Sequence, residues 1–492
     1  MVLVGVIDAA GCTVDDHALR RLLGPKYKTL LGKLTFVHRP FIGPAIIAKT
    51  YYVTHGKTSQ LTLPREVGFA LLDGGVVDEL LVDLPPGRPT AFNLDIELMA
   101  NQIVVVDWLM AHKFNPTRLD EGRGCALLDM PPSTGKTITA AALISRVGQR
   151  TLFVVLNRKL QLQAARELAT VLPDNMVETP CGVEEFRAVY ADVVVCVVNT
   201  ALALAADDFK QFGMVVIDEV HMFCSEARRE LFWKINTRVT LGMSGTTSHN
   251  RFGFDSIYKK HLGEPVMAVG LPGFRIDAIK YDVRVNAIKY YGSAEQIIGA
   301  TGYTDFGAML GQFIADEQRN LLCVRLIKSL LEDTTCKRYI IAFSDRLSHL
   351  RVIAGMLGAA VNIFDDNGFV TSMVGGSTTE ELDVANDARV VLTTYGFSGT
   401  GLNIQHLNSM VLMTPRKNGM LQIAKRITRT GSDVTIPRKI YDIIDANTTI
   451  SKQFYQRCNA YREMGFTVDK FICRAPDWEV VQKQRAAQPP LD

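Results

Sequence analysis

The stretch LLDMPPSTGKTITAAALI, residues 127–144, decides the fold of this chain. Its apolar start predicts a strand, its polar middle a loop, and its alanine-rich end a helix that begins near Thr137. The loop ends in Gly135-Lys136-Thr137, as phosphate-binding loops do, although Met130 stands where the full Walker A spacing has glycine. In such a loop, backbone N–H groups cradle phosphates, Lys136 reaches the β- and γ-phosphates, and Thr137 holds Mg²⁺. The alternative is a strand-to-helix turn that contains Gly-Lys-Thr by chance.

Short apolar segments alternate with helical patterns on both sides of this loop. Continuous runs such as TLFVVL (151–156) and ADVVVCVV (191–198) are typical of strands buried on both faces of a parallel sheet. A second series of the same kind includes RYIIAFS (338–344) and ARVVLTT (388–394). This β–α alternation predicts an α/β protein with doubly wound parallel sheets.

Composition excludes several classes of protein. A net charge of +3 over 492 residues gives no global argument for nucleic-acid binding, so any such binding needs local patches. The nine cysteines form no C-x-x-C pair, which argues against a zinc site or a disulfide framework and favours free thiols in a reducing compartment. The chain has neither an apolar run of about 18 residues nor a basic segment before its first apolar residues, so we expect an intracellular protein without a signal peptide.

Two carboxylates follow a predicted buried strand in FGMVVIDEVH (212–221). Parallel strands bring ligands to their carboxyl ends, so Asp218 and Glu219 are expected at the edge that also carries the loop. Asp218 suits Mg²⁺ coordination, and Glu219 suits a general base that positions an attacking water. The alternative is a solvated Asp-Glu pair at a strand end.

A cluster of cations lies in GMLQIAKRITRTG (419–431). If this segment is one helix, Gln422, Arg426 and Arg429 share a face, since they are spaced i, i+4, i+7. Two guanidinium groups held toward one anion are typical of arginine fingers, which neutralise charge on a transferring γ-phosphate. A basic surface helix is the alternative.

Taken together, these motifs resemble those of superfamily 2 helicases, in the same order, over residues of about 95 to 470. The matching segments, from motif I through Ia to VI, are PPSTGKT (131–137), LNRKLQLQ (156–163), DEVH (218–221), MSGTT (243–247), IIAFSDR (340–346), GFSGTGLNI (396–404) and QIAKRITR (422–429). Within the superfamily, the chain looks like the helicases of large cytoplasmic DNA viruses, typified by the poxvirus transcript-release helicase.

The resemblance implies two RecA-like domains in tandem behind a small β-rich accessory domain. It implies ATP and Mg²⁺ as cofactors, movement 3′ to 5′ along DNA or RNA, and a role with a viral transcription complex in termination and transcript release, in the host cytoplasm or the virion. The residues expected at the nucleotide are Gln102, Pro132, Ser133, Thr134, Gly135, Lys136, Thr137, Asp218, Glu219, Gln422, Arg426 and Arg429. The residues expected at the nucleic acid are Arg158, Lys159, Thr393 and Thr394.

Three positions depart from the family pattern. Ser133 replaces a glycine in the phosphate loop, Asn403 replaces an aspartate in motif V, and Lys425 replaces the glycine before the first finger. The expected domain limits are 1–92 for the accessory domain, 93–265 for the first RecA-like domain, 266–318 for a connecting segment, 319–470 for the second RecA-like domain and 471–492 for a polar tail.

Three other functions stay open at this point. A translocase that does not separate strands would share every motif. A nucleic-acid-binding module with weak or no ATPase activity, disabled at Ser133 or Lys425, would bind without hydrolysis. A P-loop kinase would need neither the second α/β half nor the distant arginines.

Overall fold

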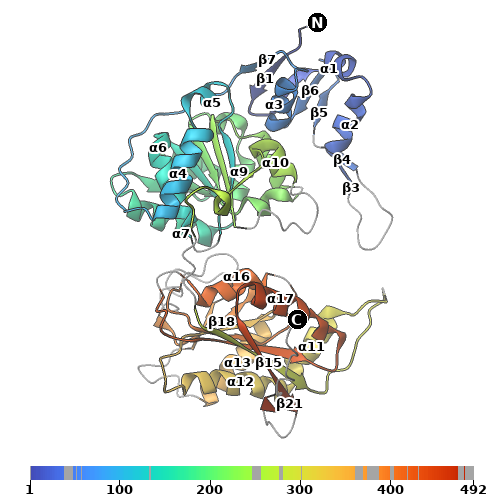
Figure 1. Cartoon of the computed structure of the whole chain (residues 1–492), viewed down its shortest axis with the longest axis vertical. Coiled ribbons are helices and arrows are strands. Elements are labelled where there is room, and N and C mark those ends of the chain that lie inside the picture. The colour runs from blue at the N-terminus through green and yellow to red at the C-terminus, as the bar shows by residue number, and fades with distance from the viewer. Residues whose placement is uncertain are drawn as a thin grey trace, which may run out of the picture. The chain divides into compact units, whose positions relative to one another are not determined.

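The computed structural model forms two compact units, residues 1–277 and 278–492 (Figure 1). The structure describes residues 2–37, 48–50, 52–56, 58–131, 134–225, 227–245, 256–275, 281–300, 302–360, 370–373, 387–398, 404–417, 419–429, 432–474 and 481–482.

The first unit begins with a small mixed sheet covered on one face by helices. Its strands, in spatial order, are β5 (Val53–His55), β6 (Gln60–Leu63), β2 (Gly11–Asp15), β1 (Val4–Asp8) and β7 (Glu79–Val82). The remaining elements are α1 (Asp16–Leu23), α2 (Lys26–Lys33), α3 (Arg65–Asp73) and the pair β3 (Thr35–Val37) and β4 (Ala48–Thr50). Ile7 and Cys12 are paired across β1 and β2 and share one buried core with residues of all three helices. The sheet alone could not bury both of its faces, so the helices supply the apolar layer.

A seven-stranded parallel sheet forms the rest of this unit. Its spatial order is β10 (Val177–Glu178), β11 (Val193–Val197), β9 (Thr151–Val155), β12 (Met214–Ile217), β13 (Val239–Ser244), β8 (Cys125–Asp129) and β14 (Pro265–Met267). Alternate strand residues enter two separate cores: Leu128 lies in one and Leu127 in the other. This double burial explains the unbroken Val/Ile runs in the sequence.

Helices cover both faces of the seven-stranded sheet (Figure 1). The first core is closed by α4 (Ala100–His112), α6 (Lys136–Val147) and α7 (Arg158–Val171). The second is closed by α8 (Val183–Ala188), α9 (Val198–Ala203) and α10 (Ser256–Leu262). The short elements are α5 (Pro116–Asp120), η1 (Ala206–Phe209), η2 (Val220–Cys224), η3 (Arg228–Trp233) and η4 (Ala268–Gly270).

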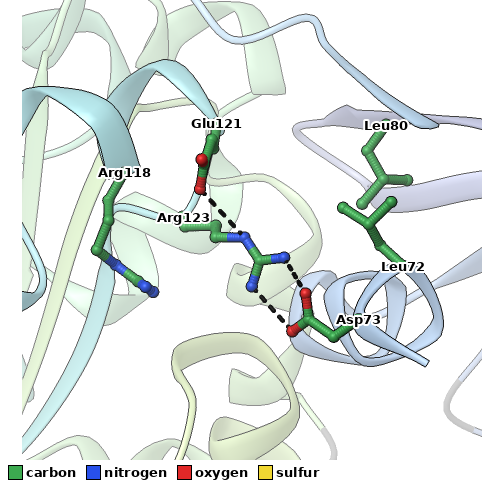
Figure 2. Close-up of a pocket in the computed structure, with 6 residues that line it drawn as sticks. All are labelled: Leu72, Asp73, Leu80, Arg118, Glu121 and Arg123. Atoms are coloured by element: carbon green, nitrogen blue, oxygen red, sulfur yellow. Dashed lines mark hydrogen bonds and ion pairs between the residues drawn. The ribbon is translucent and has the colours of Figure 1, made fainter. Parts of the chain in front are cut away.

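The N-terminal sheet is fastened to the seven-stranded part by buried arginine contacts. Arg65 on α3 is 4% exposed, and its guanidinium donates to the carbonyls of Ile235 at 2.6 Å and Thr237 at 3.2 Å. Arg123 reaches across the same junction to Asp73, with Nη1 to Oδ2 at 3.1 Å (Figure 2). Carbonyl groups buried at such a junction need donors, so we infer that the accessory part is held firmly by Arg65.

The Pro/Gly-rich segment between the two parts, residues 83–93, is docked on the larger sheet. The N–H of Thr90 donates to the carbonyl of Gly148 at 3.0 Å, and the N–H of Arg150 donates to the carbonyl of Arg88 at 2.8 Å. Pro89 and Gln149 form an isolated antiparallel bridge between these bonds. The segment therefore pairs like an edge strand, although prolines punctuate it.

The second unit is an eight-stranded sheet, parallel except at its last strand. Its spatial order is β17 (Val370–Met373), β18 (Val390–Thr394), β16 (Ile340–Ser344), β19 (Ser409–Leu412), β20 (Arg438–Asp445), β15 (Val283–Tyr291), β21 (Thr467–Arg474) and β22 (Val481–Gln482). Its helical elements are α11 (Phe306–Ala315), α12 (Glu317–Leu331), α13 (Leu347–Ala360), α15 (Tyr395–Ser398), α16 (Met420–Ala424), η5 (Lys425–Ile427), η6 (Thr449–Lys452) and α17 (Gln453–Glu463).

Two predicted boundaries differ from this arrangement. β15 lies inside 266–318, the predicted connecting segment, yet it pairs in parallel with both β20 and β21. β21 in turn runs past residue 470, into the predicted polar tail. Both strands obtain their partners from segments far away in sequence, which local patterns do not reveal. We therefore propose that the second domain begins near residue 278 and includes β21.

Candidate functional site

The loop between β8 and α6 has the backbone of a tight turn into a helix. Gly135 precedes the first helical residue with φ 82° and ψ 44°, a left-handed conformation that favours glycine. Met130 is fully buried, and its N–H donates to the carbonyl of Ser244 at 2.9 Å. Met130 is thus a core residue that joins the ends of β8 and β13, which gives a packing reason for methionine where the Walker A spacing has glycine. Pro132 and Ser133 lie outside the described residues.

The rest of the loop is held by side chains on both sides. The Thr134 hydroxyl donates to the carbonyl of Pro131 at 2.6 Å. Gln102, 2% exposed on α4, donates from Nε2 to the carbonyl of Thr134 at 3.4 Å and accepts from the N–H of Met99 at 2.9 Å. The structure therefore brings Gln102 to the loop, with its amide engaged by the backbone.

Lys136 and the acidic pair meet at the carboxyl edge of the sheet. Lys136 Nζ lies 3.6 Å from Glu219 Oε1, although the residues are 83 positions apart. Asp218 follows β12, and its carboxylate accepts from the N–H of Glu219 at 3.0 Å. Glu219 has φ 48°, which is uncommon for a residue with a side chain. Strained backbone of this kind is often found at functional sites.

Burial shapes the electrostatics of the acidic pair. The pKa of Asp218 is raised to about 7, because desolvation and, to a smaller extent, the negative charge of Glu219 outweigh the opposing charge of Lys136. Among the described residues, no three His, Cys, Asp or Glu side chains form a metal-binding group. Mg²⁺ is commonly held by one or two carboxylates together with substrate phosphates and water, so Asp218 and the half-buried Thr137 hydroxyl fit such a cation.

His221 links the acidic pair to the end of β13. Its Nδ1 lies 2.8 Å from Ser244 Oγ and 3.3 Å from Glu219 Oε2. Desolvation lowers the pKa of His221 below its usual value, despite the nearby charge of Glu219. The same nitrogen of the imidazole thus hydrogen-bonds with Ser244 and lies beside the Glu219 carboxylate, at the ends of both strands. Asp129, at the end of β8, lies close enough to act on the His221 charge, and the sequence analysis overlooked it although it ends a strand at this same edge.

Replacing Gly135 by alanine is expected to strain the loop through Gln102. A Cβ at Gly135 would lie 2.2 Å from Gln102 Nε2, and the left-handed backbone adds about 1–2 kcal/mol for any side chain. We expect Gly135→Ala to lower the free energy of unfolding by at least about 1 kcal/mol more in the native background than in a Gln102→Ala background. Denaturant unfolding of the four proteins in this cycle measures the difference.

Gly148, at the other end of α6, is the matched control. It is also left-handed, with φ 64°, but a Cβ there would meet only the carbonyl oxygen of Thr90, at an ordinary 3.5 Å. Gly148→Ala should therefore lower the free energy of unfolding by the same amount in the native and the Gln102→Ala backgrounds. Equal costs for Gly135→Ala in both backgrounds would show that Gln102 does not brace the loop.

The arginine segment of the second unit is not one continuous helix, and this part of the prediction is wrong. α16 ends at Ala424, η5 carries the chain to Ile427, and Arg429 lies beyond both. The carbonyl of Ile427 accepts from Arg438 Nε at 2.6 Å, and the carbonyl of Arg429 accepts from Ser432 Oγ at 2.7 Å. The N–H of Thr428 donates to the carbonyl of Lys425 at 3.3 Å, so the helical segment ends as a 3₁₀ turn before Arg429.

Arg426 and Arg429 are both half-buried in the second unit, and the Tyr281 hydroxyl also donates to the Arg429 carbonyl. Tyr281, Ser432 and Arg438 are thus supports of the arginine segment that the sequence analysis missed. Tyr281 and Arg438 carried no motif signal, because they lie on segments far from the arginines in sequence or beyond the motif. The side chain of Gln422, and all of Asn403, lie outside the described residues.

The four residues predicted to grip nucleic acid differ in their surroundings. Arg158 is exposed and begins α7, but one of its nitrogens already donates to Gln161 Oε1 at 2.8 Å and to the carbonyl of Thr179 at 2.9 Å. Lys159 and Thr394 are half-buried. Thr393 is fully buried at the end of β18, so its predicted surface contact is wrong for this conformation. The three residues of β18 before Thr393 are buried too, so this part of the strand is covered on both faces.

The sequence is similar to known proteins along most of its length. Residues 95–249 match a family model described as "Type III restriction enzyme, res subunit". A protein of African swine fever virus (strain Badajoz 1971 Vero-adapted), named "Putative ATP-dependent RNA helicase", is 29% identical over 367 residues, which are 71% of this chain and 70% of that protein. A protein of Acanthamoeba polyphaga mimivirus with the same kind of name is 26% identical over 72% of this chain and 66% of its own length.

Solved structures share the fold. A fragment of an HsdR subunit of a type I restriction enzyme from Vibrio vulnificus YJ016 has a TM-score of 0.52 at 16% identity, covering 77% of this chain and 68% of its own. The type ISP restriction-modification enzyme LlaBIII bound to DNA has a TM-score of 0.51 at 13% identity, covering 75% of this chain and 30% of its own.

These similarities agree with the fold and the class of enzyme predicted from the sequence. The predicted fold is confirmed: two parallel-sheet α/β domains in tandem behind a small N-terminal sheet. The chain is similar to proteins of large DNA viruses that are named putative ATP-dependent RNA helicases, in agreement with the predicted class of enzyme, an ATP hydrolase. No helix in the described part of the chain is long and apolar enough to cross a membrane.

Proposed function

We propose that this chain is an ATP-driven motor that moves along nucleic acid or unwinds it. The observation that carries the proposal is the meeting of Lys136 with Asp218 and Glu219 at the carboxyl edge of one sheet, beside a left-handed Gly135. Open α/β sheets bind their ligands at this edge. The swine fever virus and mimivirus relatives, both named as ATP-dependent RNA helicases, support the same chemistry.

In this proposal the first unit holds the nucleotide. The loop N–H groups and Lys136 bind the phosphates of ATP, and Thr137 and Asp218 hold Mg²⁺, which neutralises charge that develops on the γ-phosphate. Glu219 orients the attacking water and accepts its proton, which requires a deprotonated carboxylate close to the phosphates. Before the nucleotide enters, Glu219 is ion-paired with Lys136, with 3.6 Å between Oε1 and Nζ.

The second unit supplies charge from the other side in this scheme. Arg426 and Arg429 contact the γ-phosphate when the two domains close, and Gln422 accompanies them from α16. Arginine fingers increase the rate of phosphoryl transfer by a factor of about 10³–10⁵ in other systems. The bracing of Ile427 and Arg429 by Arg438 and Ser432 supports this role, since preorganised charge is the effective kind.

The nucleic acid is held through its phosphates in this proposal, with Arg158, Lys159 and Thr394 as contacts. Movement from 3′ to 5′, and a role in viral transcription termination and transcript release with a viral transcription complex, rest on the sequence resemblance to the poxvirus helicase. The same resemblance suggests the host cytoplasm or the virion as the place of action. Free cysteines throughout the described residues agree with a reducing compartment.

Hydrolysis assays with different nucleic acids test the motor directly. ATP hydrolysis is measured without nucleic acid and with single-stranded DNA, duplex DNA and RNA, for the native chain and for Lys136→Ala. We expect stimulation by at least one nucleic acid and loss of nearly all hydrolysis in Lys136→Ala, because the β- and γ-phosphates lose their cation.

The controls separate the alternatives. Lys113→Ala replaces a half-buried lysine that follows α4 and should keep full activity. If no nucleic acid stimulates hydrolysis and Lys136→Ala changes nothing, the chain is a binding module rather than a motor. If hydrolysis is stimulated but a labelled duplex with a 3′ overhang is never separated, the chain is a translocase.

A further inference from the structure

An uncompensated set of cations covers the first two helices of the N-terminal sheet. Residues 16–33 contain five Lys or Arg and a single acidic residue, a net charge of +4, which exceeds the +3 of the whole chain. The α1–α2 basic face comprises Arg21, Lys26, Lys28 and Lys33. All four side chains are exposed, and none takes part in an ion pair among the residues that the structure describes.

The nearby acids are already used inside the domain. Asp15 caps α1 by accepting from the N–H of Ala18 at 2.7 Å. Asp16 accepts the Tyr27 hydroxyl and pairs with Arg20 at 3.4 Å. Several exposed cations elsewhere in the same unit have acidic partners, such as Arg187 with Asp208 at 2.9 Å. The basic face therefore has charge to offer an external anion.

The start of α2 adds to this preference. Its first turn has no acidic residue, and Pro25 before it gives no side-chain cap. Lys26 and Lys28 lie in that turn, where the helix macrodipole is positive and a cation costs stability. A bound anion would offset this cost, because its negative charge opposes the positive end of the macrodipole.

The basic face is attached to the motor by a firm junction. α3 of the same small domain reaches the seven-stranded part through buried Arg65, and Asp73 at the end of α3 pairs with Arg123 (Figure 2). The acidic residues at the other end of this small domain lie near β7 in sequence, more than 35 positions after the basic face: Asp73, Asp78 and Glu79. A ligand bound by α1 and α2 would thus move together with the seven-stranded sheet.

We propose that the α1–α2 basic face binds the phosphate backbone of the nucleic acid on which the motor acts. This inference rests on the proposed function for the nature of the ligand. Scattered lysines on short helices suit a backbone of repeated phosphates, which is recognised by charge without sequence. The face gives the first unit a second grip on the same strand or duplex, outside the two α/β domains.

The test compares two charge-reversed proteins. The first carries Arg21→Glu, Lys26→Glu, Lys28→Glu and Lys33→Glu in the full chain. The control carries the same change at four exposed cations in or directly after the helices around the seven-stranded sheet: Arg146, Arg166, Arg187 and Lys210. Binding of labelled single-stranded and duplex DNA and RNA is measured by anisotropy between about 50 and 200 mM salt. ATP hydrolysis is measured alongside.

The first protein should bind at least about tenfold more weakly at 100 mM salt, with a plot of log K against log salt about two to three units less steep. Its hydrolysis without nucleic acid, and its maximal rate at saturating nucleic acid, should be unchanged. The control should keep the native slope. A glutamine version of both sets serves if a glutamate version does not fold.

Three outcomes would overturn the proposal. If the first protein matches the control, this face does not bind nucleic acid, while stimulated hydrolysis in the native chain would leave the motor itself intact. If the native chain neither binds nucleic acid nor is stimulated by it, both proposals fail together. If only binding to phosphatidylserine vesicles is lost in the first protein, the face serves a lipid surface instead.

Discussion

Glu219→Gln should stop hydrolysis while leaving ATP bound. Glutamine keeps the size of the side chain, but it cannot accept a proton from water, and a general base contributes about 10²–10⁴ to such a rate. Lys136 loses the partner that lies 3.6 Å away and keeps its full charge for the phosphates. We therefore expect the hydrolysis rate to fall by about 10²–10⁴-fold with ATP affinity unchanged or higher. Single-turnover hydrolysis and binding of a fluorescent ATP analogue separate the two effects.

The matched control for this change is Glu230→Gln. Glu230 lies on η3 of the same domain, is exposed, and is 3.5 Å from Arg229. The substitution therefore removes one surface charge without affecting the site. Its effect on hydrolysis should be negligible. A loss of less than about threefold in Glu219→Gln would mean that another group acts as the base. Loss of ATP binding with the rate would mean that the ion pair with Lys136 organises the loop instead.

Arg319→Met should destabilise the second unit more than any surface change. Arg319 on α12 is fully buried, pairs with Asp445 on β20 at 2.6 and 3.1 Å, and donates to the carbonyl of Met413. Removing one member of a buried ion pair leaves the other charge without compensation in a medium of low dielectric constant, at a cost of about 3–5 kcal/mol. Denaturant unfolding, followed by probes in each unit, measures the loss.

Two further proteins define what the pair contributes. Lys328→Met on the same helix removes an exposed cation that lies 3.7 Å from Glu332, and it should change the free energy of unfolding by less than about 1 kcal/mol. Arg319→Met combined with Asp445→Leu should recover most of the loss, because a buried apolar pair needs no counter-charge. If the double variant is as unstable as Arg319→Met, the bond to the Met413 carbonyl is the main contribution of the arginine.

Much of the fold could be predicted because it is written in local patterns. The continuous apolar runs at 151–156 and 191–198 predicted buried parallel strands, and β9 and β11 lie there. The strand, loop and helix around Gly135 are where the sequence predicts them. These features depend on side-chain periodicity and backbone preference over a few residues, which are legible in any sequence.

Other features depend on groups that meet only in the folded chain. β15 was assigned to a connecting segment because its partners, β20 and β21, lie about 150 residues or more away. Arg429 was placed on a helix face, but the helical segment ends as a 3₁₀ turn at Ile427, and the carbonyls of Ile427 and Arg429 accept from the side chains of Arg438 and Ser432. Spacing along the sequence does not show where tertiary contacts end a helix.

The sequence by itself determined the class of the site: a glycine-lysine-threonine turn and two carboxylates, each placed at a strand end. The tertiary structure decided what these residues can do together. Only the tertiary structure brings Lys136 within 3.6 Å of Glu219. It also buries Asp218, which raises the pKa of its carboxyl group, and it places Met130 in the core. The physical reason is that desolvation and ion pairing depend on distances between segments far apart in the chain, whereas motifs record only spacing along it.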